Sequence, residues 1–347
     1  MPINLISIRL LSQQLASPLF STPEEVVSHF GIMQAQDYRM MRWAVSMRTV
    51  KPSSAAFKSA FDEGRIIRMH LNRGTWQLVN RSDYWWMLRL CGPGSIAAIT
   101  GWMHTNGVHI SEEELLRVRD ILMEESCLKG SATKENFACA LRGKGIVMDD
   151  HRLSYHIRLA ELSGVLCSGE LRQDKSSYAL VAKRIGPETV PMGRDEALAL
   201  LARKYFRSHA PATLEDFVWW SGLGVGDCRQ AVASIRGELR EAAVSGRTFL
   251  IHDSCRTRGF RRGQLILLPP YDEYLIGYKS RDIVLDRDFV HKAHSNNGIF
   301  HPVILSDGHV CGNWKRSGLE TEFFDGSIPE PSLLEPALSR YESFMLR

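Results

Sequence analysis

Three segments of the chain share one layout, in which a threonine is followed closely by acidic residues, an apolar face and a glycine. They are STPEEVVSHFGIMQ, SATKENFACALRGKG and PATLEDFVWWSGLG. A threonine oxygen can accept an N–H bond at the start of a helix, and acidic side chains stabilise its first turn. Glycine can end a helix and allow a tight turn. We therefore expect short helices from Thr22 to Gly31, Thr133 to Gly143 and Thr213 to Gly222.

Each of these segments has similar neighbours on both sides. A stretch with helical apolar spacing precedes each one: SIRLLSQQLA, EEELLRVRDILMEE and DEALALLARKYFRSH. An alternating pattern typical of a β-hairpin follows each one, at 66–79, 164–181 and 238–251. A helix, a helix-turn-helix and a hairpin together make a winged helix. The alternative is three unrelated helical segments that share only their N-cap chemistry.

The C-terminal quarter has a different pattern. GQLILLPPYDEYLIGY and GIFHPVILSDGHVCGNWKR predict strands, and the tail SIPEPSLLEPALSRYESFM predicts a short helix. A chain of 347 residues is long enough for several domains. We predict an α+β fold with three tandem winged-helix domains and a C-terminal β-rich segment with a tail. The predicted boundaries are 1–108, 109–190, 191–255 and 256–347.

Composition narrows the class of protein only slightly. The hydrophobic share of 44% and charged share of 24% are those of an ordinary globular protein, and the net charge is +4. A mildly basic balance fits nucleic-acid binding, but it also fits many enzymes. The seven cysteines lack a CxxC pair and the histidines lack ligand spacing, so we expect no metal site and no cofactor. The N-terminus does not resemble a signal peptide, and we expect a cytoplasmic protein.

Gln34 and Gln36 stand out in the stretch GIMQAQDYRMMRWAV, directly after the first predicted helix-turn. Polar, uncharged side chains at a turn that faces DNA favour a protein that does chemistry on DNA. From the residues alone, the alternative is two solvated glutamines on the surface of a helix. Residues two apart on an α-helix point roughly 200° apart, whereas on an extended segment they share a face. If both glutamines hold one water, the backbone here must depart from a regular helix.

Five motifs in order resemble the AlkZ/YcaQ-like DNA glycosylases: MQAQD, LNRGTWQLV, HAPATLEDFVWWSGL, LPPYDEYLIGYKSRD and GIFHPVILSDGHVCGNWKR. The resemblance covers the chain from about residue 5 to 316. It implies tandem winged helices and excision of alkylated bases from DNA. It also implies that Gln34-Ala35-Gln36 is the active-site motif, in the Gln-apolar-Gln form of the AlkZ branch. Gln77 departs from the pattern, since many relatives have histidine there.

The chemistry that the resemblance implies is within the reach of glutamine. An N7-alkylated purine is already cationic and leaves as a neutral base. A general acid typically accelerates such a reaction by about 10²- to 10⁴-fold, and this leaving group has little need of that acceleration. What remains is to hold a water and to place dipoles near the developing charge, and a glutamine amide both accepts and donates hydrogen bonds. Asp37 is the alternative source of a negative charge. No lysine adjoins the motif, so we expect a monofunctional enzyme without lyase activity.

The expected partner is double-stranded DNA that contains alkylated bases, including bulky or crosslinked ones, bound by a monomer in the cytoplasm at the nucleoid. Phosphate contacts from basic residues would position the duplex. TRGFRRG is the densest basic stretch, a loop whose aromatic residue would probe the groove. The candidate DNA-binding residues are Arg39, Arg42, Arg68, His70, Arg73, Arg258, Arg261 and Arg262. The alternatives are a non-catalytic DNA-binding regulator and a protein-interaction scaffold.

Overall fold

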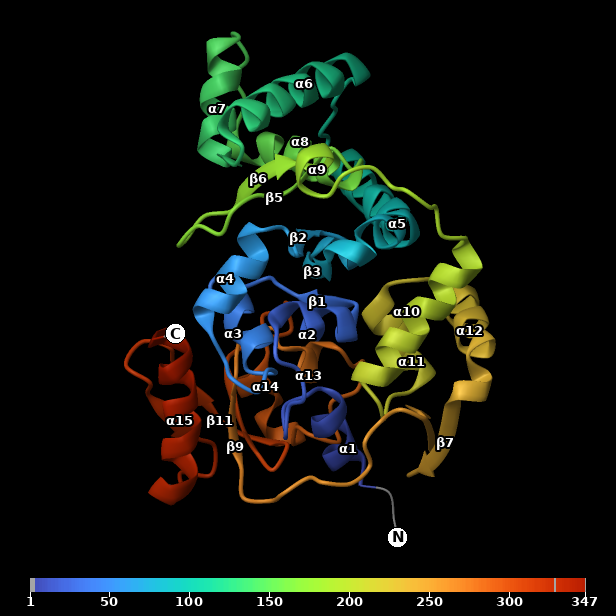
Figure 1. The fold of residues 1–347 in the computed structure, drawn as a ribbon, viewed down its shortest axis with the longest axis vertical. Coiled ribbons are helices and arrows are strands. Elements are labelled where there is room, and N and C mark those ends of the chain that lie inside the picture. Colours follow the sequence, from blue (N-terminus) through green and yellow to red (C-terminus); the bar gives the residue numbers. More distant parts are fainter. Residues whose placement is uncertain (1–3, 328, 347) are drawn as a thin grey trace. The chain divides into compact units, whose positions relative to one another are not determined.

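The computed structural model describes residues 4–327 and 329–346 and has a mixed α/β fold (Figure 1). The chain divides into two compact units. Unit 1 comprises the described residues of 1–57 and 198–347, and unit 2 comprises residues 58–197. The four predicted domains have other boundaries and remain a prediction.

Unit 1 begins with a series of short elements. They are α1 (Leu5–Ser12), α2 (Pro23–Phe30), β1 (Ile32–Gln34), α3 (Met41–Ser46) and the start of α4 (Ser54–Asp62). The chain returns to this unit along α10 (Arg194–Ser208). It continues through α11 (Leu214–Ser221), α12 (Val225–Ser234) and the antiparallel hairpin of β7 (Leu239–Val244) and β8 (Arg247–His252). The hairpin predicted at 238–251 is therefore confirmed.

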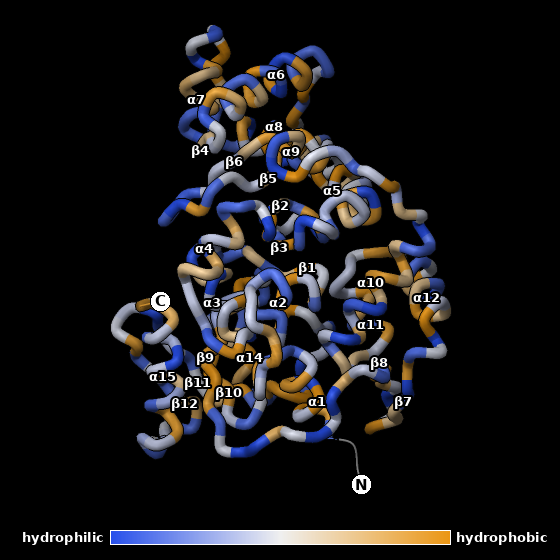
Figure 2. The backbone as a smooth tube through the Cα atoms, in the orientation of Figure 1, coloured by the Kyte–Doolittle hydropathy of each residue, from blue (hydrophilic) through white to orange (hydrophobic). Residues whose placement is uncertain are grey.

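The C-terminal part of unit 1 contains a four-stranded antiparallel sheet in the order β12-β11-β10-β9. The strands are β9 (Leu265–Leu268), β10 (Val303–Ser306), β11 (His309–Trp314) and β12 (Thr321–Phe323). Residues of β9 and β10 are strongly apolar, as the orange tube in Figure 2 shows, and much of both strands is buried. Asp307 and Gly308, both with positive φ, form the predicted turn between β10 and β11. Helix α15 (Pro331–Leu346) contacts β9 (Figure 1).

Two details of this region differ from the sequence-based expectation. The second half of GQLILLPPYDEYLIGY is not a strand, because Asp272 caps a short helix, α13 (Glu273–Ile276), through Oδ1 and the N–H of Tyr274. The tail helix is 16 residues long, so it is not short. Between α13 and β10 lie η4 (Arg287–Phe289) and α14 (Val290–Ala293).

Unit 2 begins with the end of α4, followed by the hairpin of β2 (Ile66–His70) and β3 (Trp76–Asn80) and the long helix α5 (Tyr84–Thr105). It continues with α6 (Glu112–Lys129), β4 (Ala132–Thr133), α7 (Lys134–Gly143) and α8 (Asp150–Leu162). The antiparallel strands β5 (Leu166–Ser168) and β6 (Ser177–Leu180) follow, and α9 (Val181–Arg184) ends the regular structure. The hairpins predicted at 66–79 and 164–181 are confirmed.

The threonine caps form as predicted. Thr22, Thr133 and Thr213 each accept an N–H bond at the start of α2, α7 and α11 inside a capping box. Gly31 and Gly222 then end α2 and α11 with positive φ. These three caps fix where the short helices begin.

The second segment ends differently from the prediction. Gly143 is the last residue of α7, and the turn is made by Gly145, whose φ is +76°. Gly145 N–H donates to Arg142 O and Ile146 N–H donates to Leu141 O, the pattern of a Schellman motif. The prediction took the first glycine after the apolar run, but the left-handed position falls two residues later.

Candidate active site

Gln34 and Gln36 lie on a non-helical segment of unit 1. Gln34 is the last residue of β1 and Gln36 belongs to the irregular stretch that follows it. The condition set by the sequence, that the backbone here departs from a regular helix, is therefore confirmed. Gln34 is only 6% exposed, whereas Gln36 is exposed. The motif thus passes from a buried position to an exposed one within two residues.

Both ends of this segment are held by local hydrogen bonds. Gly31, with φ +79°, ends α2 and turns the chain into β1. On the other side, Asp37 Oδ1 accepts the N–H groups of Arg39 and Met40, at 2.9 and 2.8 Å, and shapes the turn before α3. Asp37 is thus a backbone cap, which weakens the alternative in which it supplies charge to the substrate.

A buried carboxylate holds the backbone of Gln34. The Gln34 N–H donates to Glu273 Oε1 over 2.5 Å, and Glu273 is 3% exposed at the start of α13. Its other oxygen, Oε2, accepts from His209 Nε2 and Trp220 Nε1, each at 3.1 Å. Three N–H donors from β1, the end of α10 and α11 therefore converge on one carboxylate.

His209 and its neighbours are enclosed by aromatic rings. His209 is fully buried and stacks on Tyr205, with the ring centroids 4.5 Å apart. Burial lowers the pKa of His209, although the bond to Glu273 partly opposes this, so the ring is neutral near pH 7. In this state Nε2–H donates to Glu273 and Nδ1 accepts from Ser208 Oγ, 2.8 Å away.

A second buried carboxylate ties α13 to the N-terminal elements. Asp272 forms a two-pronged ion pair with Arg48, with N–O distances of 2.7 and 2.9 Å. Arg48 also donates to Gln13 O and Ala44 O. These charge-assisted bonds tie the start of α13 to the end of α1 and to α3.

The candidate DNA-binding arginines fall into two groups. Most of them are at the surface: Arg39, Arg73, Arg258, Arg261 and Arg262 are exposed and Arg42 is partly exposed. Phe260, inside the TRGFRRG stretch, packs partly buried against the apolar core of unit 1. The aromatic residue predicted to probe the groove therefore anchors this loop to the protein, and the three arginines project around it.

Arg68 and His70 are engaged inside unit 2. The Arg68 guanidinium lies 3.8 Å from the centre of the Trp76 ring and donates to Ser176 Oγ. His70 Nδ1 lies 2.6 Å from Glu161 Oε2, and burial lowers the pKa of His70 despite this carboxylate. Both side chains are buried, 3% and 5% exposed, so they stabilise the β2–β3 hairpin and do not offer a phosphate-binding surface.

Gln77 lies on β3, 3% exposed, and its Nε2 donates to Thr75 Oγ1 at 2.7 Å. The residue that departs from the family pattern is thus part of the hairpin's own hydrogen bonding. Among the described residues, no group of three or more histidine, cysteine, aspartate or glutamate side chains is arranged to hold a metal ion. The helices in the same part of the chain also lack the length and apolar character of a membrane span.

Sequence reasoning missed Glu273 and His209, although both belong to the motifs that carry the family resemblance. The available signal was the pair Asp272-Glu273 inside an otherwise apolar run. Two adjacent acids that are buried need partners, which points to a polar network. Gln34 and His209, the partners of Glu273, are 239 and 64 positions from it in the sequence, so no local pattern identifies them.

Comparisons with known proteins identify the family of the chain and a solved structure of similar fold. The family model for AlkZ-like DNA glycosylases matches residues 27–322. Among solved structures, the chain is similar to the Streptomyces sahachiroi DNA glycosylase AlkZ, with a TM-score of 0.77 and 20% sequence identity over 99% of this chain and 97% of that one. A search of curated proteins finds no match. The matched segment includes both glutamines and Glu273, and the chain belongs to the AlkZ-like DNA glycosylase family.

Proposed function

We propose that this protein is a monofunctional DNA glycosylase that hydrolyses the N-glycosidic bond of cationic N7-alkylpurines, including bulky and crosslinked adducts. The observation that carries the proposal is the Gln34-Ala35-Gln36 segment, which is non-helical, with the Gln34 backbone held by Glu273 and Gln36 exposed. A non-helical backbone allows side chains at i and i+2 to lie on one face, which a regular α-helix does not, and in this proposal the two glutamines bind one water together.

The reaction proceeds by departure of the base and capture of the sugar by water. The glycosidic bond breaks toward the base, which takes the electron pair and leaves neutral because it began as a cation. The side-chain carbonyl oxygens of Gln34 and Gln36 accept hydrogen bonds from the water. These bonds hold the water oxygen toward C1′ of the sugar. The water adds to the oxocarbenium-like sugar and loses a proton to solvent. Positioning and preorganised dipoles supply the catalysis.

The duplex is bound through phosphates, in this proposal, by the exposed arginines at positions 39, 42, 73, 258, 261 and 262. The element order supports three tandem winged helices, because a capped helix followed by a hairpin occurs three times along residues 1–255. Phosphate contacts position the protein without reading sequence, which suits a repair enzyme that acts wherever damage occurs. We propose that the protein acts as a monomer at the nucleoid.

Release of N7-methylguanine from alkylated duplex DNA tests the proposal. The wild-type protein is expected to release the base and leave an intact abasic strand, without a borohydride-trapped adduct. The same protein should leave a neutral alkylated base of similar size in place, because that base lacks the positive charge that helps it leave. Absence of release at high enzyme concentration, together with sequence-selective binding of undamaged DNA, would instead indicate a regulator.

A further inference from the structure

Glu273 has no part in the water-holding chemistry, yet it is the one carboxylate that an identified hydrogen bond joins to the Gln34 backbone in the described structure. We propose that Glu273 is a positioning residue, whose carboxylate fixes the peptide that carries Gln34 and so aims the Gln34 amide at the nucleophilic water. This inference rests on the proposed function for its catalytic consequence. The contact itself stands on the geometry alone.

The first argument is the arrangement of donors. Glu273 Oε1 faces the Gln34 N–H, while Oε2 faces the donors of His209 and Trp220. A side chain with two acceptor oxygens satisfies this set, and a side chain with one acceptor does not. The contact to Gln34 is also short, as charge-assisted hydrogen bonds are.

The second argument is that Glu273 itself has little freedom. A Cβ added at Gly277 would come within 2.8 Å of the His209 ring, so the end of α13 packs closely against the ring that donates to Glu273. Asp272 fixes the start of α13 through its ion pair with Arg48. The carboxylate is therefore held by His209 and Trp220, on a helix whose start is itself fixed.

Glu273→Gln makes the most direct test. The glutamine oxygen can satisfy His209 and Trp220 only at the Oε2 position, which turns the NH₂ group toward the Gln34 N–H, donor against donor. Gln34 then shifts, and a displacement of about 1 Å costs on the order of 10² in rate. The expected result is a single-turnover rate of N7-methylguanine release reduced by about 10²-fold, with the affinity for damaged DNA unchanged.

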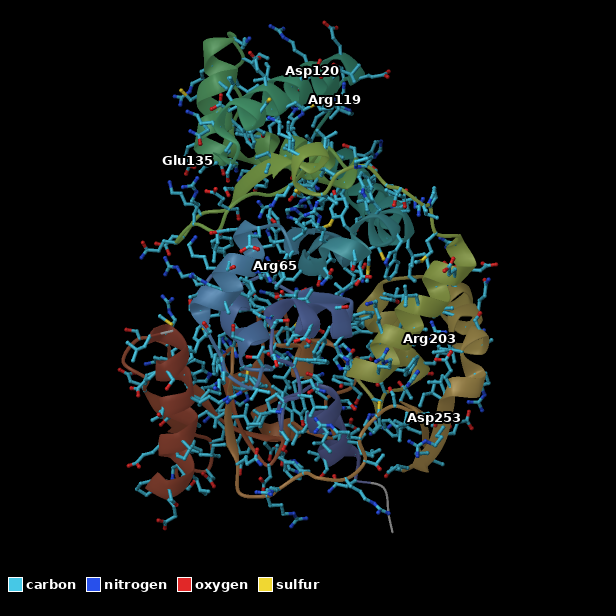
Figure 3. All side chains as sticks on the ribbon, in the orientation of Figure 1. Arg65, Arg119, Asp120, Glu135, Arg203 and Asp253 are labelled. Carbon is cyan, nitrogen blue, oxygen red and sulfur yellow. The ribbon has the colours of Figure 1, made fainter. Side chains whose placement is uncertain are left out.

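The matched control is Glu238→Gln, the same carboxylate-to-amide change in the same unit. Glu238 accepts two hydrogen bonds from Arg203, a residue of α10 labelled in Figure 3, and a third contact from His252. These bonds lower the pKa of Glu238 to about 2, so Glu238→Gln removes a charged acceptor just as Glu273→Gln does. Because Glu238 does not touch Gln34, this variant should keep the release rate.

A spectroscopic readout tests the contact without any activity. Met33-Gln34 is the one Met-Gln pair in the sequence, so carbonyl-¹³C methionine with ¹⁵N glutamine selects a single amide signal. In the wild type this proton should be shifted downfield by the carboxylate and exchange slowly. Glu273→Gln should abolish both properties. Trp220→Phe, which removes a donor from the other oxygen, should retain them.

The outcomes separate the two claims. A folded Glu273→Gln variant with the wild-type rate or the wild-type Gln34 signal overturns the positioning role. A rate that falls only as far as that of Glu238→Gln overturns it as well. If Glu273→Gln does not fold, Glu273→Asp keeps a carboxylate but shortens it, and a retained Gln34 signal there also overturns the proposal. A wild type that shows the signal without base release refutes the proposed function and leaves the contact standing.

Discussion

At the scale of single residues, the glutamine pair could be proposed from the sequence, but the residue that holds its backbone could not. MQAQD follows a recognisable cap-and-glycine helix, and the geometry of residues two apart required a non-helical backbone, which the structure has. Glu273 reaches Gln34 across 239 positions of sequence. Periodicity and turn chemistry act over a few residues, so they carry no information on such a contact.

Asp37 offers a residue-scale prediction, since its Oδ1 caps the turn after the motif. Asp37→Asn keeps one oxygen that can accept the same two N–H bonds, so we expect base release within about threefold of wild type. Asp37→Ala removes the cap and should cost about 1 kcal/mol in the free energy of unfolding. Urea unfolding and single-turnover release measure the two effects. A hundredfold loss of rate in a stable Asp37→Asn protein would show that the negative charge itself takes part in the chemistry.

At the scale of elements, the caps and hairpins were predictable because each depends on nearby residues. Thr22, Thr133 and Thr213 all cap helices, and the three hairpins form where alternation indicated them. The failures have physical reasons. Gly143 stands inside α7 because Gly145 takes the left-handed position, and α13 replaces a predicted strand because Asp272 caps it.

The TRGFRRG loop carries an element-scale prediction, because its arginines differ in environment from the arginine just before it. Arg258, Arg261 and Arg262 are exposed, whereas Arg256, which precedes the motif, donates to Leu11 O and Ser17 O. Replacing the three exposed arginines with alanine should weaken binding to duplexes of any sequence. The slope of log affinity against log salt should fall by about 1 for each lost phosphate contact. Fluorescence anisotropy across a salt series measures this slope.

Arg256→Ala, directly before the TRGFRRG loop, is the control. It should lower the melting temperature through the lost bonds to the α1 region and leave the salt slope unchanged. If the triple variant binds DNA with an unaltered salt slope, the loop does not contact phosphate and the DNA surface lies elsewhere.

At the scale of the whole molecule, the mixed α/β class was predictable and the two-unit division was not. The repeat of capped helices and hairpins indicated serial domains along the chain. The structure instead joins 1–57 with 198–347 in one compact unit. The buried ion pair between Arg48 and Asp272 links the two chain segments of this unit, and its partners are 224 positions apart.

Stability of the whole molecule should fall in mild acid. Burial lowers the pKa of His29 to about 4, and it also lowers the pKa values of His70, His156 and His209. The unfolded chain therefore binds more protons than the folded one below about pH 6.5, the ordinary pKa of histidine. The stability from these neutral histidines is complete above that pH and is lost as pH falls toward the folded pKa values. Each such proton costs about 1.4 kcal/mol per pH unit.

Urea unfolding at about pH 7.5, 6 and 5 checks the sign of this dependence. His29→Gln, which keeps a donor for the Ser12 carbonyl, should reduce the acid slope by about one proton, whereas a change at the exposed His104 should not. Stability that rises between about pH 7 and 5 would contradict the neutral, buried state of these rings.

The most direct test of the central claim is the single-turnover rate of N7-methylguanine release by Gln34→Ala/Gln36→Ala, with enzyme in excess and DNA affinity measured in parallel. If the pair holds the nucleophilic water, the rate should fall by at least about 10²-fold while damaged DNA is bound as tightly as by the wild type. Release at the wild-type rate by the folded double variant would contradict the account and place the catalytic water on other residues.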